Sequence, residues 1–214
     1  MPSAPAVDPA DRQLTSQGRE RKQQLVACAA ELFAERGYGE TRIKDIVDAA
    51  GVAKGLFYWY FDNKEALFAE VAADIRLRLR KHQRSAIDPD AGALRQIRQG
   101  AEASVHFMAE NAPFFSLLEA ETGAATQDSR SQGTAQHVRD VRVLVVLGQD
   151  AGAIVDEDPE LLALGVVGTV GYYSHCHRTG RTTADIDDLA RFVARTVVRT
   201  LAADPDAAAG ALAG

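Results

Sequence analysis

The sequence predicts an all-α protein, and three observations carry this prediction. Apolar residues recur at three- and four-residue spacing through most of the 214-residue chain, which is the period of a buried helix face. Several of these segments begin at an Asp or Asn close to a proline, as helices often do. The β-branched run at residues 141–147 lies inside a longer helical pattern, so we expect about nine helices and no strand.

The composition is that of an ordinary soluble globular protein. Hydrophobic residues make up 46% of the chain, charged residues 25%, and the net charge is −6. No apolar run is long enough to span a bilayer, and the first 18 residues lack the apolar segment of a secretory signal. The two cysteines are far apart in the sequence. We therefore expect a cytoplasmic protein with no membrane association and no disulfide framework.

The N-terminal region predicts a tail followed by a compact domain. Residues 1–18 are rich in Pro, Ala and Asp without a period, and we expect a disordered tail there. Residues 19–65 form the first predicted domain. Its first helix begins with basic residues and carries an apolar face that stops at Gly37.

Two short helices follow around a glycine. Residues 43–50 carry an apolar face, Gly51 supplies the positive φ that a tight turn needs, and a second helix opens near Lys54. Helix, turn and helix in this order is the helix-turn-helix pattern, whose second helix enters the DNA major groove.

This segment resembles the DNA-binding domain of the tetracycline-repressor (TetR) family. The family pattern is filled here by Thr41, Ile46, Ala50-Gly51-Val52, Gly55, Tyr58, Phe61 and Lys64-Glu65-Ala66-Leu67. One departure is Arg42, where the family usually has Thr or Ser. The resemblance implies a homodimeric transcriptional regulator, most often a repressor of a palindromic operator, with a helical C-terminal domain that binds a small-molecule effector and dimerises.

Side-chain chemistry suggests a role for each residue near the recognition helix. We expect Lys54 to read a guanine edge, Gly55 to permit close approach, and Leu56 to touch a thymine methyl. Tyrosine, tryptophan and lysine side chains would donate to phosphates. The predicted DNA-binding residues are Thr41, Arg42, Lys44, Lys54, Gly55, Leu56, Tyr58, Trp59, Tyr60 and Lys64.

The run of five aromatics at residues 57–61 also suits a small hydrophobic core. Five successive side chains cannot all face one way around a helix, so we expect Phe57 and Phe61, four residues apart, to point inward. The three aromatics between them would then lie partly outward and be available to DNA.

Charge is distributed unevenly along the chain. Residues 19–64 hold eight basic and seven acidic side chains, a net +1, so the remainder of the chain carries −7. Because phosphate attraction needs local positive charge, the acidic total does not exclude DNA binding.

Residues 66–205 form the second predicted domain. Predicted helix starts, including one at the domain junction, are Asp62 with Glu65, Asp88-Pro89, Asn111 with Pro113, Asp158-Pro159, and Thr182 with Asp185. Residues 206–214 are expected to fray. The resemblance implies a largely apolar effector. Candidate walls of its pocket are Phe107, Phe114, Phe115, Leu118, Leu144, Tyr172, Tyr173 and His175, although each of them taken singly fits the core better than a pocket.

The last two predicted helices resemble a subunit interface. The final one carries an apolar stripe at heptad-like spacing, made by Ile186, Leu189, Val193, Thr196 or Val197, and Leu201. In the preceding helix, Gly165, Gly168 and Gly171 recur every third residue. Glycine inside a helix costs about 1 kcal/mol relative to alanine, so this stripe indicates close backbone packing, in the core or across a dimer.

Residue chemistry outside the DNA-binding segment favours neither a metal site nor catalysis. His175, Cys176 and His177 are too close in a helix to point the same way, and no further ligand completes a set. We expect no metal, no cofactor and no enzymatic activity. Two alternatives remain open: a helical scaffold protein that contains a helix-turn-helix without binding DNA, and a cofactor-using helical enzyme.

Overall fold

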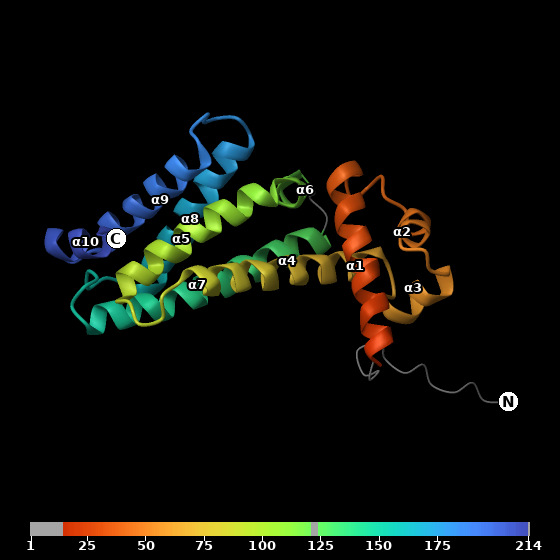
Figure 1. Ribbon diagram of the computed structural model, residues 1–214, viewed down its shortest axis with the longest axis horizontal. Helices are drawn as coiled ribbons and strands as arrows, with labels where there is room; N and C mark the ends of the chain where they lie inside the picture. Colours follow the sequence, from red (N-terminus) through yellow and green to blue (C-terminus); the bar gives the residue numbers. More distant parts are fainter. Residues whose placement is uncertain (1–14, 121–123, 214) are drawn as a thin grey trace. The chain divides into compact units, whose positions relative to one another are not determined.

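The computed structural model describes residues 15–120 and 124–213, and of residues 120, 124–130 and 132 it describes the backbone alone. This part of the chain contains ten helices and no strand (Figure 1). The predicted all-α class is confirmed, with one helix more than expected. None of the helices in the described ranges is both long and apolar enough to cross a membrane.

The chain divides into two compact units, Met1–Asp74 with Ser116–Ser129, and Ile75–Phe115 with Arg130–Gly214. The helices are α1 (Ser16–Arg36), α2 (Ile43–Ala49), α3 (Lys54–Tyr60), α4 (Lys64–Ala86), α5 (Ala93–Glu110), α6 (Ala112–Ala120), α7 (Ala124–Asp150), α8 (Pro159–Arg178), α9 (Ile186–Leu201) and α10 (Pro205–Leu212).

In the first unit, α1, α2, α3 and the start of α4 share one hydrophobic core. Phe33, Phe57 and Phe68 are fully buried in it, and the rings of Phe33 and Phe68 lie 5.8 Å apart. Helix α1 begins three residues before the predicted domain start, because the Thr15 hydroxyl accepts a hydrogen bond from the Gly18 N–H at 3.1 Å. The helix ends at Gly37, as predicted, with φ of 84°. The rest of the predicted tail, residues 1–14, lies outside the described residues.

The turn between α2 and α3 has the predicted geometry. Gly51 adopts φ of 62°, a conformation that L residues with a Cβ rarely take. The Val52 N–H then donates to the Val47 carbonyl at 3.0 Å, which closes the end of α2. Helix α2, a glycine turn and helix α3 therefore form the expected helix-turn-helix.

The cap of helix α4 lies one residue after the predicted cap, Asp62. The Asn63 side-chain oxygen accepts from the Ala66 N–H at 2.7 Å, so Asn63 is the residue that caps this helix. The Asp62 assignment is therefore wrong, although the capping chemistry is of the expected kind.

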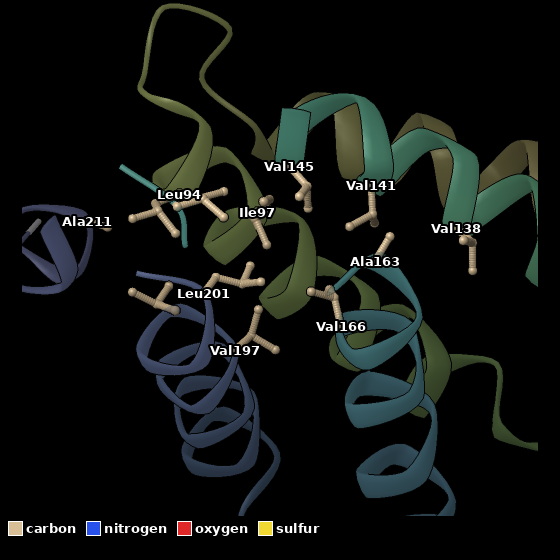
Figure 2. Close-up of a cluster of buried hydrophobic side chains, with 12 residues drawn as sticks. Leu94, Ile97, Val138, Val141, Val145, Ala163, Val166, Val197, Leu201 and Ala211 are labelled. Atoms are coloured by element: carbon tan, nitrogen blue, oxygen red, sulfur yellow. The ribbon is translucent and has the colours of Figure 1, made fainter. Parts of the chain in front are cut away.

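In the second unit, α5 packs along α8 and α9, and α10 contacts α5 and α9. Figure 2 shows a cluster of buried side chains, nearly all of which belong to α5, α7, α8, α9 and α10. Leu94 and Ile97 of α5 lie among the side chains of the other helices in this cluster. A second cluster, which includes Ala101, Val170 and Val193, continues the same packing of α5, α8 and α9.

The apolar stripe of α9 requires a correction. Leu189, Val193, Val197 and Leu201 are at most 4% exposed, because this face of α9 packs inside its own chain and chiefly against α5. Heptad-like spacing describes any well-buried helix face, and here it marks the core of the protomer rather than a subunit contact.

The C-terminal segment also differs from the prediction. Instead of fraying, the segment forms α10, with Asp204 as N-cap: its carboxylate accepts from the Ala207 N–H at 2.8 Å. Ala211 is buried against α5 and α9, and the Arg95 guanidinium donates to the carbonyls of Gly210 and Ala213. Asp-Pro followed by alanines is a strong helix start, which explains this helix.

The predicted helix starts have mixed outcomes. Asp158 caps α8 as expected, accepting from the Glu160 N–H at 2.8 Å. The prediction at Asp88-Pro89 is wrong, because Asp88 instead closes a local turn and α5 begins after Gly92. Of the predicted pair at the start of α9, Asp185 alone provides the cap.

Candidate nucleic-acid interface

Helix α3 presents one face to the core and the other to solvent. Phe57 and Phe61, at 0% and 3% exposure, point inward as predicted. Tyr58 and Trp59 are 47% and 38% exposed, although both are large aromatics that normally bury more of their surface. The alternation follows from helix geometry, and it leaves an outward aromatic face on a helix that is otherwise anchored in the core.

The basic side chain of this face is Lys54, in the first turn of α3. It is exposed, and its ammonium lies 5.9 Å from the centroid of the Tyr58 ring, one helical turn further on. A positive charge and a phenol hydroxyl therefore share the same outward surface. Both groups can donate hydrogen bonds to phosphates or to base edges.

Gly55 lies between these side chains and is exposed. A Cβ added there would meet no atom of the described residues within 4 Å, and the residue does not adopt positive φ. In the part of the chain that the structure describes, neither packing nor backbone conformation therefore requires glycine at this position. Its absent side chain leaves the surface of α3 open to a close external partner.

Helix α2 adds two exposed basic residues at its N-terminal end, Arg42 and Lys44. The Arg42 N–H donates to the Asp45 carboxylate at 3.0 Å, which fixes the start of the helix and leaves the guanidinium outside. The Lys44 ammonium is 2.5 Å from the Asp48 carboxylate, and this hydrogen bond raises the pKa of Lys44 above its ordinary value. Lys44 is therefore charged, and DNA would compete with Asp48 for it.

Two of the predicted contact residues instead face the interior. Thr41 is fully buried, and its hydroxyl lies 2.8 Å from the Gly37 carbonyl and 3.2 Å from the Leu32 carbonyl. The Lys64 ammonium donates to the carbonyls of Tyr38 and Thr41 at 2.7 and 3.0 Å. The prediction that the side chains of Thr41 and Lys64 contact DNA is therefore corrected. Both side chains instead stabilise the segment between α1 and α2.

The remaining predicted contacts, Leu56 and Tyr60, are half-buried. The Tyr60 ring meets the Trp59 ring edge-on with their centroids 4.7 Å apart, so the two side chains pack against each other. The structure thus brings together Arg42, Lys44, Lys54, Gly55, Tyr58 and Trp59 as the exposed face of the helix-turn-helix, hereafter the α2–α3 face.

The second unit contains a partly enclosed cavity of about 70 Å³ among α4, α5, α7 and α8. Of the predicted effector walls, Leu144 lines it. The other seven lie elsewhere: Phe107 and Phe114 are buried in the core, Tyr172 is exposed, and Phe115, Leu118, Tyr173 and His175 are half-buried outside the cavity.

The polar lining of this cavity comes mainly from residues that were not predicted, among them Gln83, Ser104 and His137. They belong to three different helices, so no local motif joins them. One signal was present in the sequence. Ile97, Ala101 and Ser104 follow one another at four- and three-residue spacing, so Ser104 places a polar side chain on the apolar face of α5. A polar residue on a buried stripe usually has a partner there.

Comparison with known proteins agrees with this geometry. Residues 25–71 match the family model of bacterial regulatory proteins, tetR family. The HTH-type transcriptional regulator YdgC of Bacillus subtilis is 40% identical over 68 residues, which are 32% of this chain and 35% of that protein. The HTH-type transcriptional repressor KstR2 of Rhodococcus jostii is 47% identical over 51 residues, 24% of this chain and 25% of that protein.

The chain thus spans about a third or less of the length of these two relatives, and their likeness is concentrated in the helix-turn-helix. The fold likeness extends further. The crystal structure of a TetR-family transcriptional regulator from Rhodococcus sp. superimposes with a TM-score of 0.76 at 21% identity, covering 86% of this chain and all of that one. Residues 25–71 thus match the tetR family of bacterial regulatory proteins in sequence, and the chain shares its fold with this regulator from Rhodococcus sp..

Proposed function

We propose that the protein is a cytoplasmic transcriptional repressor that binds a palindromic operator as a homodimer and leaves it when a small molecule binds the second unit. The observation that carries the proposal is the α2–α3 face, where Lys54, Tyr58 and Trp59 are exposed beside Gly55, whose added Cβ would meet none of the described residues within 4 Å. An outward aromatic and basic surface on a second helix of this kind suits the DNA major groove.

Exposed apolar surface on α8 supports dimerisation. Leu161, Leu164 and Tyr172 are 66%, 45% and 59% exposed and lie on one face of the helix. Gly165 and Gly168 share that face, and a Cβ at either would meet nothing within 4 Å among the described residues. Packing within the chain therefore does not account for the glycines, and Phe192 of α9, 44% exposed, extends the apolar surface. A second copy of the chain would cover it.

Release by an effector would act through a population shift. A ligand changes DNA affinity only if it binds better to the conformer that no longer fits two successive major grooves. Helix α4 is a continuous helix whose residues belong to both units, and Gln83 near its C-terminal end lines the cavity. A ligand that moves α4 would thus bias the helix-turn-helix. The relative KstR2 is itself named a repressor.

Selection from a random duplex pool with the full-length chain tests the proposal. We expect recovery of a two-fold symmetric site, with binding that weakens steeply as salt rises. Lys54→Ala should relax base preference at one position of each half-site. Lys81→Ala, which removes an exposed lysine of α4 in the second unit, is the matched control and should leave preference unchanged.

Failure to enrich any sequence, with no salt-dependent affinity for duplex DNA, would remove the DNA-binding function and favour the scaffold alternative. An equal loss of affinity for all sequences in Lys54→Ala would show that this lysine contacts phosphates rather than base edges.

A further inference from the structure

The cavity of the second unit is small and mostly apolar. Its walls include Ile97 of α5, Val141 of α7 and Val166 of α8, which also belong to the core cluster of Figure 2. Roughly 10–15 Å³ of such space admits one water, so the cavity's 70 Å³ admits a ligand of about five to seven non-hydrogen atoms. A larger molecule would have to move the helices apart.

One part of the wall is polar and organised by hydrogen bonds. The Gln83 side-chain amide donates to the Ser104 hydroxyl at 2.9 Å and lies 3.2 Å from His137 Nε2. The Ser104 hydroxyl in turn donates to the Gly100 carbonyl at 2.6 Å. The serine is therefore satisfied within the protein, and the amide nitrogen of Gln83 has its donors in use.

Two further polar atoms of the Gln83 and His137 side chains take no part in the hydrogen bonds just described. One is the Gln83 amide oxygen, an acceptor. The other is His137 Nδ1, which carries the proton when Nε2 accepts from Gln83. A ligand hydroxyl both donates and accepts, so it matches this pair, and a carbonyl matches the imidazole N–H.

The charge of the wall argues against an anion. None of the described residues that line the cavity is Lys or Arg, and Asp140 contributes a carboxylate beside it. Burial lowers the pKa of His137, with Asp140 opposing the effect, so the imidazole is neutral at neutral pH. An anionic head group would be desolvated here without a cationic partner, which is costly.

We propose that the effector site of this protein takes a compact, uncharged molecule with an apolar body and a single hydroxyl or carbonyl group, which binds at Gln83 and His137. This inference rests on the proposed function only where it calls the bound molecule an effector. Occupancy of the cavity is measurable without DNA.

Four matched probes test the chemistry by calorimetry or ligand-observed NMR on the full-length protein: cyclopentanol, cyclopentanone, methylcyclopentane and cyclobutanecarboxylate. Cyclopentanol and cyclopentanone should bind more tightly than methylcyclopentane by about threefold to tenfold, the contribution of one hydrogen bond. Cyclobutanecarboxylate should bind at least about tenfold more weakly than cyclopentanol, because its charge is left without a partner.

Gln83→Met keeps the length of the side chain and removes its amide. We expect it to weaken cyclopentanol by about threefold to tenfold and to leave methylcyclopentane within about twofold. Gln99→Met, the same substitution on α5 outside the cavity, should change neither. Ala101→Leu fills the cavity and should abolish binding of all four probes; far-UV circular dichroism checks that each variant is folded.

Binding of the carboxylate in preference to the alcohol would overturn the proposed chemistry, as would an equal effect of Gln83→Met on every probe. Absence of binding by all four would overturn the cavity as a site for ligands of this size. If cyclopentanol binds but the selected operator is still held, the site stands and the release step of the proposed function is wrong. If no operator is found, the binding data are unaffected.

Discussion

The Lys64 ammonium lies 4.1 Å from the centroid of the Tyr38 ring and donates a hydrogen bond to the carbonyl of the same tyrosine at 2.7 Å. A second hydrogen bond reaches the Thr41 carbonyl. One side chain at the start of α4 therefore holds the segment that leads from α1 into α2. Its position makes Lys64 a structural element of the domain rather than a member of its exposed face.

Lys64→Met should destabilise the first unit by about 1–3 kcal/mol, because two carbonyls lose a charged donor and the ring loses a cation. Chemical denaturation of the full-length variant measures this change. Lys44→Met is the control: the Lys44 side chain is exposed, so stability should hardly change while DNA affinity falls. A Lys64 variant with unchanged stability and weakened DNA binding would return Lys64 to the interface.

Gly55→Ala separates folding from DNA binding. Alanine is the better helix former and its Cβ would meet none of the described residues within 4 Å, so the first unit should gain about 0.5–1 kcal/mol of stability. If the backbone of α3 approaches DNA closely, operator affinity should fall by about tenfold in an electrophoretic or fluorescence titration. Gly210→Ala in α10, also in open space, should leave operator affinity unchanged. Undiminished affinity in Gly55→Ala would exclude a close approach at this residue.

Gly168→Leu tests the dimer surface of α8. Since a Cβ at Gly168 would meet nothing within 4 Å among the described residues, we expect the folded protomer to tolerate a leucine there, while a close-packed partner should not. Sedimentation velocity should show dissociation at concentrations where the parent chain is dimeric. Gly210→Leu places the same bulk on another helix and should sediment as the parent does. Intact dimers in Gly168→Leu would move the interface away from this face.

His137 predicts an acid-sensitive second unit. Its pKa is lower in the folded protein than in the unfolded chain, so on acidification the unfolded state binds the proton first. The stability contribution is complete above about pH 6.5, the ordinary imidazole value, and declines as the pH falls towards the lowered folded value. Denaturation of the parent and of His137→Gln at a series of pH values measures the difference between them. The difference in the free energy of unfolding between the two proteins should decrease as the pH falls. A difference that stays constant with pH would contradict a lowered pKa of His137.

The fold class and the helix-turn-helix were predictable because their signals are local. Gly37 and Gly51 have the backbone conformations that their places in the pattern demand, and the inward positions of Phe57 and Phe61 follow from helical spacing. Helix starts were less certain. Asp88-Pro89 and Asp158-Pro159 have the same local chemistry, yet only the second begins a helix.

The functional surfaces were harder to predict because they depend on which elements pack together. The heptad-like stripe of α9 looks the same in sequence whether it faces α5 or a second subunit. Thr41 and Lys64 fit the family pattern equally well as DNA contacts or as internal supports. Gln83, Ser104 and His137 form the polar wall of the cavity from three different helices, so no regular spacing in the sequence relates them.

The hydrogen bonds from Arg95 to the carbonyls of Gly210 and Ala213 attach the end of α10 to α5. An affinity tag or reporter fused directly after residue 214 would disturb these hydrogen bonds, whereas a flexible spacer before the tag would preserve them. Truncation after residue 203 would remove α10. Leu94 and Leu201, which belong to the same buried cluster as α10, would then become more exposed and promote aggregation.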